Sequence, residues 1–232
     1  MSSTFSAVPA RARFIDDNWV RSDQYHNKFL LKDDAALEHA LQNSTASGLP
    51  PIAVSAAQGK LLYLLAKTTH AKRVLEVGTL GGYSTIWFGR ALPEDGRIVT
   101  LELEEKHAKV ARQNFEHAGL ASKIEVRVGP AADSLKELPS SEPFDLVFID
   151  ADKPNNPTYY KEARRLTRKG SVIIVDNVVR AGLVADPAQE GEFVDGVREL
   201  LRDIQADAGV EATTLATVGE KGYDGFTYIL VL

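Results

Sequence analysis

Short segments rich in apolar residues recur along the middle of the chain, separated by amphipathic stretches. They predict strands at Arg73–Val77, Arg97–Glu102, Ile124–Val128, Phe144–Ile149 and Ser171–Val175, of which the last two are apolar almost throughout. Between them, the spacing of apolar positions predicts helices over Gly82–Leu92, Glu104–Ala118 and Pro157–Thr167. Near-continuous apolar strands that alternate with helices are typical of a parallel sheet covered on both faces. We therefore expect a doubly wound, Rossmann-like α/β fold.

The two ends of the chain depart from this alternation. Residues 1 to about 70 are predicted to be helical, with helices at Arg13–Arg21, Asp33–Gln42 and Ser55–Thr69, the last with Ser55 as N-cap. After a helix at about Pro187–Ala208, the predicted strands are Ala212–Val218 and Phe226–Leu232. The link between them is too short for a helical crossover, so they should pair as an antiparallel hairpin. We expect one domain over 1–232, with the last strand reversed.

Composition excludes several classes of protein. The 232 residues carry a net charge of −5 without a basic stripe, which disfavours nucleic acid as a partner. There is no cysteine, so disulfides and thiol chemistry are excluded. No apolar run approaches the roughly 20 residues needed to cross a bilayer. A cytoplasmic enzyme is expected. Residues 1–13, with three serines, two arginines and no acid, resemble a mitochondrial transit peptide only weakly, and a frayed terminus is favoured.

The first strand ends in a glycine-rich turn, which suggests a nucleoside site. Its glycines are spaced G-x-x-G-G from Gly78, and Leu80 stands where a dinucleotide motif has its middle glycine. A ligand without phosphates is therefore favoured, and Glu76 suits the amino group and sulfonium of S-adenosylmethionine. Glu102 ends the second strand, where an acid can accept hydrogen bonds from both ribose hydroxyls. The alternative is that Glu102 is one of several solvated acids.

The next strand ends carry oxygen donors. Phe144–Ile149 leads into Asp150, and Ser171–Val175 leads into Asp176 and Asn177. If these strands are neighbours, two carboxylates and an amide meet at one rim and suit Mg²⁺, Mn²⁺ or Ca²⁺. Each residue taken alone could equally be a helix cap or turn former.

With these motifs the sequence resembles the cation-dependent O-methyltransferases, the family of caffeoyl-CoA and catechol O-methyltransferases. The resemblance covers about Val54 to Leu232 and rests on Glu76-Val77-Gly78 with Gly82-Tyr83-Ser84, Gly129-Pro130-Ala131, Asp150-Ala151-Asp152-Lys153 and Asp176-Asn177. It implies a seven-stranded sheet with a reversed last strand. It implies a metal held by Asp150, Asp176 and Asn177, and Lys153 as the catalytic base beside Asp150. It also implies a methyl-donor site lined by Val54, Glu76, Gly78, Thr79, Ser84, Glu102, Ala131 and Asp152.

One departure bears on the acceptor. Plant caffeoyl-CoA enzymes usually carry Trp-Asn-Gly after the Asp-Asn pair, and here Ala181 replaces the asparagine that contacts substrate. A free catechol-type phenol or flavonoid is therefore favoured over a CoA thioester, as in the microbial and fungal branch. Many relatives are homodimers, which we expect here too. Two alternatives stay open: a nicotinamide-dependent oxidoreductase and a non-catalytic adenosyl-ligand-binding protein.

Residues outside these motifs are assigned less specific roles. The five histidines are placed at surface positions of helices, since none follows a strand or has metal-ligand spacing. Tyr159 and Tyr160 are equally compatible with the core and with the adenine site. Trp19 and Tyr25 are candidates for stacking on an aromatic acceptor at the substrate rim.

Overall fold

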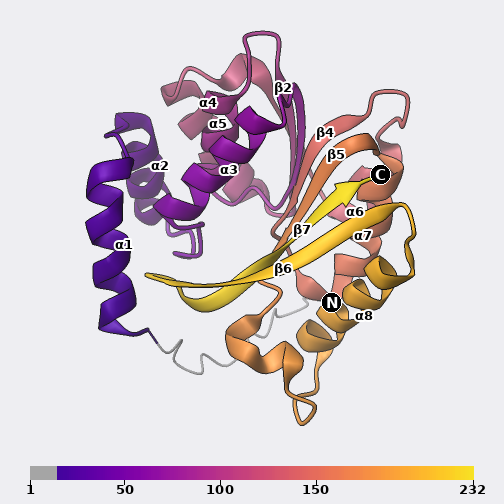
Figure 1. The fold of residues 1–232 in the computed structure, drawn as a ribbon. Helices are drawn as coiled ribbons and strands as arrows, with labels where there is room; N and C mark the ends of the chain where they lie inside the picture. The colour runs from indigo at the N-terminus through magenta and orange to yellow at the C-terminus, as the bar shows by residue number, and fades with distance from the viewer. Residues whose placement is uncertain (1–14) are drawn as a thin grey trace.

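The computed structural model describes residues 15–232, whose strands form one seven-stranded sheet in the order β3-β2-β1-β4-β5-β7-β6 (Figure 1). β7 pairs antiparallel with both β5 and β6, and the other pairs are parallel. The predicted mostly parallel sheet with a reversed last strand is confirmed. The strands are β1 (Arg73–Val77), β2 (Arg97–Glu102), β3 (Ile124–Val128), β4 (Phe144–Ile149), β5 (Thr167–Asp176), β6 (Val210–Gly219) and β7 (Gly222–Val231).

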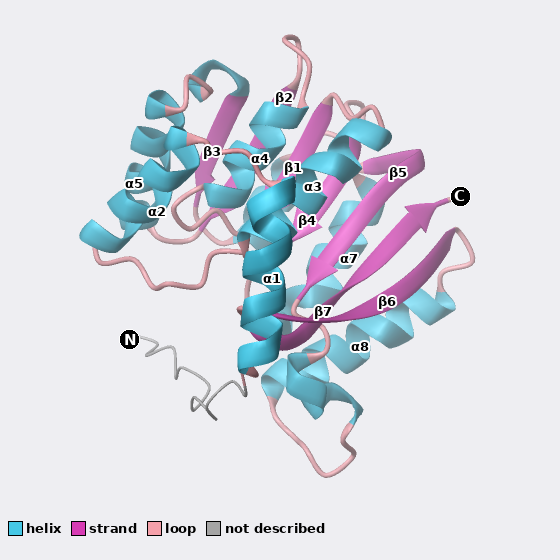
Figure 2. Ribbon diagram, turned by 60° about the vertical axis from the view of Figure 1, so that its left-hand side comes forward, coloured by secondary structure: helices cyan, strands magenta, loops and turns pink. Residues whose placement is uncertain are grey.

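Helices cover both faces of this sheet (Figures 1 and 2). One face packs against α2 (Ala35–Ala46), α3 (Ala56–Thr68), α4 (Tyr83–Ala91) and α5 (Glu105–His117). The other packs against α6 (Ala131–Glu137), α7 (Asn156–Arg165) and α8 (Glu192–Ala206). Short 3₁₀ segments are η1 (Ala121–Lys123), η2 (Lys153–Asn155) and η3 (Arg180–Ala185). α1 (Asp17–Leu30) lies at the margin, and none of its residues is buried.

Two separate cores explain why the central strands are apolar throughout. Successive residues of a strand point to opposite faces of the sheet. In β1, Val74 belongs to the core under α3 and α4, whereas Leu75 belongs to the core under α7 and α8. In β4, Phe148 and Ile149 divide in the same way. Because both faces are buried, alternation between polar and apolar positions is absent from these strands.

The ends of the chain differ from the predicted boundaries. α1 continues to Leu30, well beyond the predicted end at Arg21, because a helix without a buried residue leaves little apolar periodicity to follow. The hairpin strands are longer than predicted and are joined by two residues, Glu220 and Lys221. The tight turn forms because Gly222 takes a φ of 86°, a conformation that glycine adopts without a steric penalty. The glycines assigned to a seven-residue link therefore belong largely to strands.

Two helical elements were mispredicted. α6 follows Pro130 directly and was not predicted, since seven residues give too short a window for a helical period. α8 begins at Glu192 after Gly191, later than the predicted Pro187. Within residues 15–232, no helix is long and apolar enough to cross a bilayer. The possible transit segment at residues 1–13 lies outside the described part of the chain.

Candidate active site

A cavity of about 1110 Å³ opens where β1, β2, β4 and β5 end. The turns after these strands form its floor. The β6–β7 turn and α1 border it, and Asp23 of α1 accepts a hydrogen bond from the backbone N–H of Glu220 at 2.9 Å. The carboxyl ends of parallel strands are where ligands bind in open α/β sheets. Apart from Glu76, every residue assigned from the sequence to the donor site, the metal or catalysis lines this cavity, whereas the stacking candidates Trp19 and Tyr25 do not line it.

The turn after β1 is built for close backbone approach. A Cβ on Gly78 would overlap the carbonyl oxygen of Asp150 at the end of β4, so this position excludes a side chain. Leu80 takes a φ of 50°, which is uncommon for a residue other than glycine. Its N–H and that of Thr79 donate to Glu102 Oε2 at 2.7 and 3.2 Å. The acid at the end of β2 therefore holds the glycine turn in place.

Glu102 is also bound on its other oxygen. Oε1 accepts from the backbone N–H of Glu104 at 3.0 Å and lies 3.3 Å from His107 Nδ1. The residue is only 7% exposed but lines the cavity, so it is not one of the solvated acids. His107, in the first turns of α5, also lines the cavity, contrary to the surface position assigned to it from the sequence. The position of His107, five residues after the acid that ends β2, is the sequence signal that could have placed it in the cavity.

Glu76 lies apart from the cavity. It is fully buried between β1, β2 and α4, and its carboxylate accepts hydrogen bonds from Ser84 at 2.6 Å, Thr100 at 2.6 Å and Thr85. Burial raises the pKa of Glu76 to about 7, and the three hydroxyl donors act in the opposite direction. Ser84 does line the cavity, so Glu76 reaches the site through this hydroxyl.

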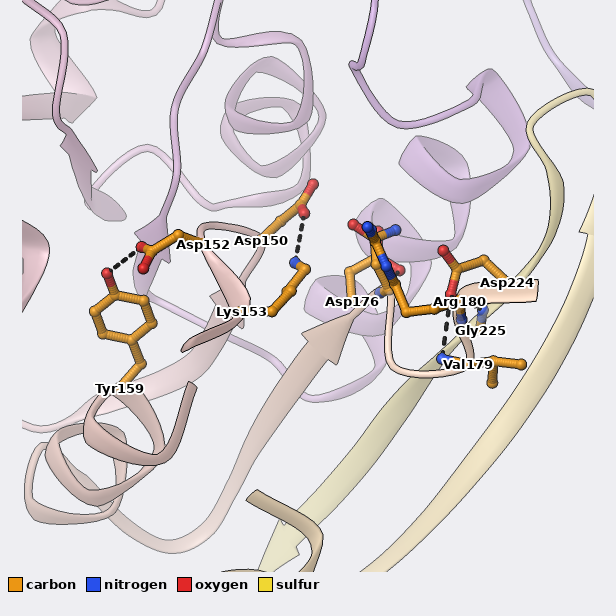
Figure 3. Close-up of polar contacts among 10 residues, drawn as sticks. Asp150, Asp152, Lys153, Tyr159, Asp176, Val179, Arg180, Asp224 and Gly225 are labelled. Atoms are coloured by element: carbon orange, nitrogen blue, oxygen red, sulfur yellow. Dashed lines mark hydrogen bonds and ion pairs between the residues drawn. The ribbon is translucent and has the colours of Figure 1, made fainter. Parts of the chain in front are cut away.

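The remaining predicted donor-site residues surround the same space. Asp152 accepts a hydrogen bond from Tyr159 at 2.6 Å (Figure 3), and both residues line the cavity. Burial, followed by the Asp152 hydrogen bond, raises the pKa of the Tyr159 hydroxyl, so Tyr159 stays a neutral donor. Tyr160 faces away and donates to Asp207 at 2.9 Å. The cavity wall is completed by Val54 and Ala131, on segments far apart in the sequence.

Asp150, Lys153 and Asp176 meet at the other end of the cavity (Figure 3). The side chain of Lys153 is 4% exposed, and its Nζ lies 3.3 Å from Asp150 Oδ1. Burial raises the pKa of Asp176 well above its usual range, the charge of Asp150 raises it further, and Lys153 lowers it. Two carboxylates here face one lysine, so this end of the cavity is suited to additional positive charge.

The third predicted ligand, Asn177, takes a φ of 56° directly after β5. Asparagine tolerates this left-handed conformation better than most residues. Within residues 15–232, no group of three or more histidine, aspartate and glutamate side chains is placed to hold a metal. A cation bound to Asp150 and Asp176 would therefore take its third protein donor from the Asn177 amide. Oxygen-only donors of this kind fit a hard divalent cation.

Asp224 of β7 organises the loop beyond these residues, a role not foreseen from the sequence. Its Oδ1 accepts from the backbone N–H groups of Val179, Arg180 and Gly225 at 3.2, 2.8 and 3.0 Å (Figure 3). The Val178 N–H donates to the Gly225 carbonyl at 3.0 Å. The reversed strand thus fixes the segment that follows Asn177.

Residues 27–230 match a family model described as O-methyltransferase. The chain belongs to the O-methyltransferase family. This O-methyltransferase is 51% identical over 209 residues to a catechol O-methyltransferase of Mycobacterium tuberculosis, covering 90% of this chain and 94% of the relative. It is 46% identical to a catechol O-methyltransferase of Niastella koreensis over 211 residues, with 90% and 96% covered.

Solved structures agree with this assignment. The O-methyltransferase of Bacillus cereus, solved in complex with SAH (S-adenosylhomocysteine), superposes with a TM-score of 0.90 at 50% identity, covering 93% of this chain and 99% of that one. The resemblance inferred from the motifs is thus confirmed at the level of family and fold. Membership also favours a methyltransferase over the two alternatives, an oxidoreductase and a non-catalytic binding protein.

Proposed function

We propose that the protein transfers a methyl group from S-adenosylmethionine to one hydroxyl of a catechol-like acceptor, with a divalent cation bound at Asp150, Asp176 and Asn177. The observation that carries the proposal is the meeting, in one cavity, of the glycine turn held by Glu102 and the carboxylates of Asp150 and Asp176. The donor would lie over Gly78, Thr79, Glu102, Ala131 and Asp152. The relatives named catechol O-methyltransferase support the acceptor class.

Glu76 acts indirectly in this proposal. Its carboxylate orients the Ser84 hydroxyl at the start of α4, where Ser84 would contact the amino acid part of the donor. Glu102 would accept from the ribose in place of its weakest present contact, the 3.3 Å interaction with His107. We propose this relayed contact in place of the direct contact between Glu76 and the donor that the motif suggested.

Lys153 is the proposed base. When bound, the cation would hold both vicinal oxygens of a catechol and lower the pKa of the attacking hydroxyl. In its neutral form, Lys153 Nζ would accept the hydroxyl proton and become an ammonium, and Asp150 orients Nζ through the 3.3 Å contact. As the oxygen–methyl bond forms, the methyl–sulfur bond breaks, and S-adenosylhomocysteine leaves with the electron pair. The near-complete burial of Lys153 excludes water from the proton transfer.

Chelation tests this function. We expect excess EDTA to abolish methylation of catechol and added Mg²⁺ or Mn²⁺ to restore it, because the acceptor needs the cation as its anchor. Phenol, which has one hydroxyl and cannot chelate, should be methylated far more slowly. Product formation is measured by mass spectrometry. As a control, calorimetry should show that S-adenosylhomocysteine still binds in EDTA.

Two results would contradict the proposal. Full activity in excess EDTA would show that the reaction needs no cation. Equal rates on catechol and phenol would show that the acceptor does not need to chelate one. Loss of S-adenosylhomocysteine binding in metal-replete protein would refute the donor assignment instead.

We also propose that the protein is a homodimer. Exposed apolar side chains lie on α1 and on the adjoining edge strand β6, including Tyr25 at 64%, Phe29 at 67% and Leu215 at 51% exposed. α1 and β6 are in contact, and β6 has no strand partner on its outer edge within residues 15–232. An unpaired strand edge beside apolar side chains is a typical self-association surface.

A further inference from the structure

Arg180 is the one arginine among residues 15–232 that lines the cavity. Its guanidinium makes no hydrogen bond or ion pair within that part of the chain, and its one recorded contact is the ring of Phe193, 5.9 Å away. By contrast, the other cation at the acceptor end, Lys153, is paired with Asp150. A half-buried guanidinium without an anionic partner is unusual, because arginine offers five hydrogen-bond donors.

The backbone holds Arg180 in this position. Arg180 and Ala181 have φ values of 54° and 55°, and Gly182 follows at 85°. Left-handed conformations are costly for residues other than glycine and persist only where surrounding contacts impose them. Here the imposing contact is Asp224, which accepts the N–H groups of Val179 and Arg180. The strained backbone and the unpaired side chain thus occur at the same residue.

Nearby acids do not supply the missing partner. Asp224 Oδ1 already accepts three backbone N–H groups, which spreads its charge over the loop. Asp176 lies deeper, at 5% exposed, beside Asp150 and Lys153. Lys221, in the β6–β7 turn, also lines the cavity, next to Glu220 of the same turn. On the η3 side of the cavity, the guanidinium of Arg180 is therefore the group that is suited to an anion.

We propose that Arg180 binds a carboxylate on the acceptor, so that the preferred substrates are catechols bearing an acidic side group. This inference rests on the proposed function, since it places the two hydroxyls at Asp150 and Asp176. Arg180 begins η3 shortly after Asp176 ends β5, and both residues line the cavity, so a substituent of a ring anchored at Asp176 would share this space with the guanidinium. A planar guanidinium binds a carboxylate with two parallel hydrogen bonds, which lysine cannot reproduce.

Two nearly isosteric acceptors test the proposal: 3,4-dihydroxybenzoate, which is charged, and 3,4-dihydroxybenzamide, which is neutral. The measured quantity is the ratio of kcat/KM for the acid to that for the amide. Comparing this ratio between variants cancels the intrinsic difference in hydroxyl acidity. In Arg180→Gln the ratio should fall by about ten-fold or more relative to the wild type, as expected for loss of a charged hydrogen-bonded pair. Arg180→Lys should retain part of the preference.

Arg202→Gln is the matched control, because Arg202 is exposed on α8 outside the cavity, and it should keep the wild-type ratio. Thermal melting verifies that the Arg180 variants are folded. An unchanged ratio in Arg180→Gln overturns the proposal. An equal loss of kcat/KM on both acceptors also overturns it, because the guanidinium would then contact the aromatic ring or support the loop. If the wild type methylates neither catechol, the proposed function itself fails, and this inference fails with it.

Discussion

Glu76 is a carboxyl group buried among hydroxyl donors, and its ionisation affects the stability of the fold. Burial raises its pKa from 4.5 to about 7. A carboxyl whose pKa is raised on folding favours the native state when protonated. Its contribution is fully present below pH 4.5 and is lost as the pH rises through about 7.

Replacing Glu76 by glutamine should remove this pH dependence. Relative to Glu76→Gln, the wild type should lose free energy of unfolding between pH 4.5 and 7, by up to roughly 3 kcal/mol at about 1.4 kcal/mol per pH unit. Urea unfolding followed by circular dichroism at several pH values measures it. Glu116→Gln, at an exposed site on α5, should keep the wild-type slope. If the free energy of unfolding changes with pH equally in the wild type and in Glu76→Gln, Glu76 stays ionised or is solvated on folding.

At the scale of single residues, the sequence predicts which residues belong to the site better than it predicts the contacts they make. Asp150, Asp176 and Asn177 could be found because each directly follows a strand, and strand ends of a parallel sheet converge. The relayed position of Glu76 could not, because its partners Thr85 and Thr100 belong to other elements. Arg180 was missed for a different reason: its role depends on the absence of a partner, which only the folded chain reveals.

Among the elements, the contact between α8 and η2 determines where Lys153 lies. A Cβ on Gly196 would overlap the Lys153 carbonyl and approach Pro154 Cα to 2.8 Å. The backbone atoms there cannot move aside as a flexible side chain could. Gly196 therefore lets α8 press directly on the turn that carries the proposed base.

Gly196→Ala should displace η2 and misplace Lys153. We expect kcat to fall at least ten-fold, toward the roughly 10²–10⁴-fold loss expected of Lys153→Met if Lys153 is the general base. S-adenosylhomocysteine affinity, measured by calorimetry, should fall less than kcat, because Asp152 beside η2 is one donor contact and the others lie on other elements. Gly89→Ala is the matched control, since its Cβ would meet the movable side chain of Leu120. Wild-type turnover in folded Gly196→Ala would show that η2 tolerates the displacement.

The bounds of the central strands were predictable from their buried apolar residues. β1, β2 and β4 agree with the predicted strands to the residue, because apolar runs specify central strands directly. The edge strand β3 also agrees, although none of its residues is buried. The bounds of helix α1 and of the edge strand β6 were not predicted, since α1 has no buried residue and most of β6 is exposed. The tertiary contacts that shape them, such as Asp23 with Glu220, join residues far apart in the sequence.

For the whole molecule, the exposed apolar side chains on α1 and β6 predict a dimer, and the mass of the protein in solution tests this. One chain is 25.3 kDa, so a dimer should measure about 50.6 kDa (2 × 25.3) by light scattering. Phe29→Glu combined with Leu215→Glu should shift the mass to 25.3 kDa, because charges at an apolar interface are not tolerated. The control variant Leu201→Glu, at an exposed position of α8, should remain dimeric. A wild type of 25.3 kDa would contradict the proposed dimer.

The position of β7 also sets an order of assembly during synthesis. β7 leaves the ribosome after the other six strands of this sheet, yet it inserts between β5 and β6 and supplies Asp224 to the loop after Asn177. The glycine turn and Glu102, on β1 and β2, are synthesised long before Asp224. Until β7 emerges, β5 keeps an unpaired edge open to other chains. The synthesis of β7 therefore completes the acceptor half of the site and closes this edge of β5.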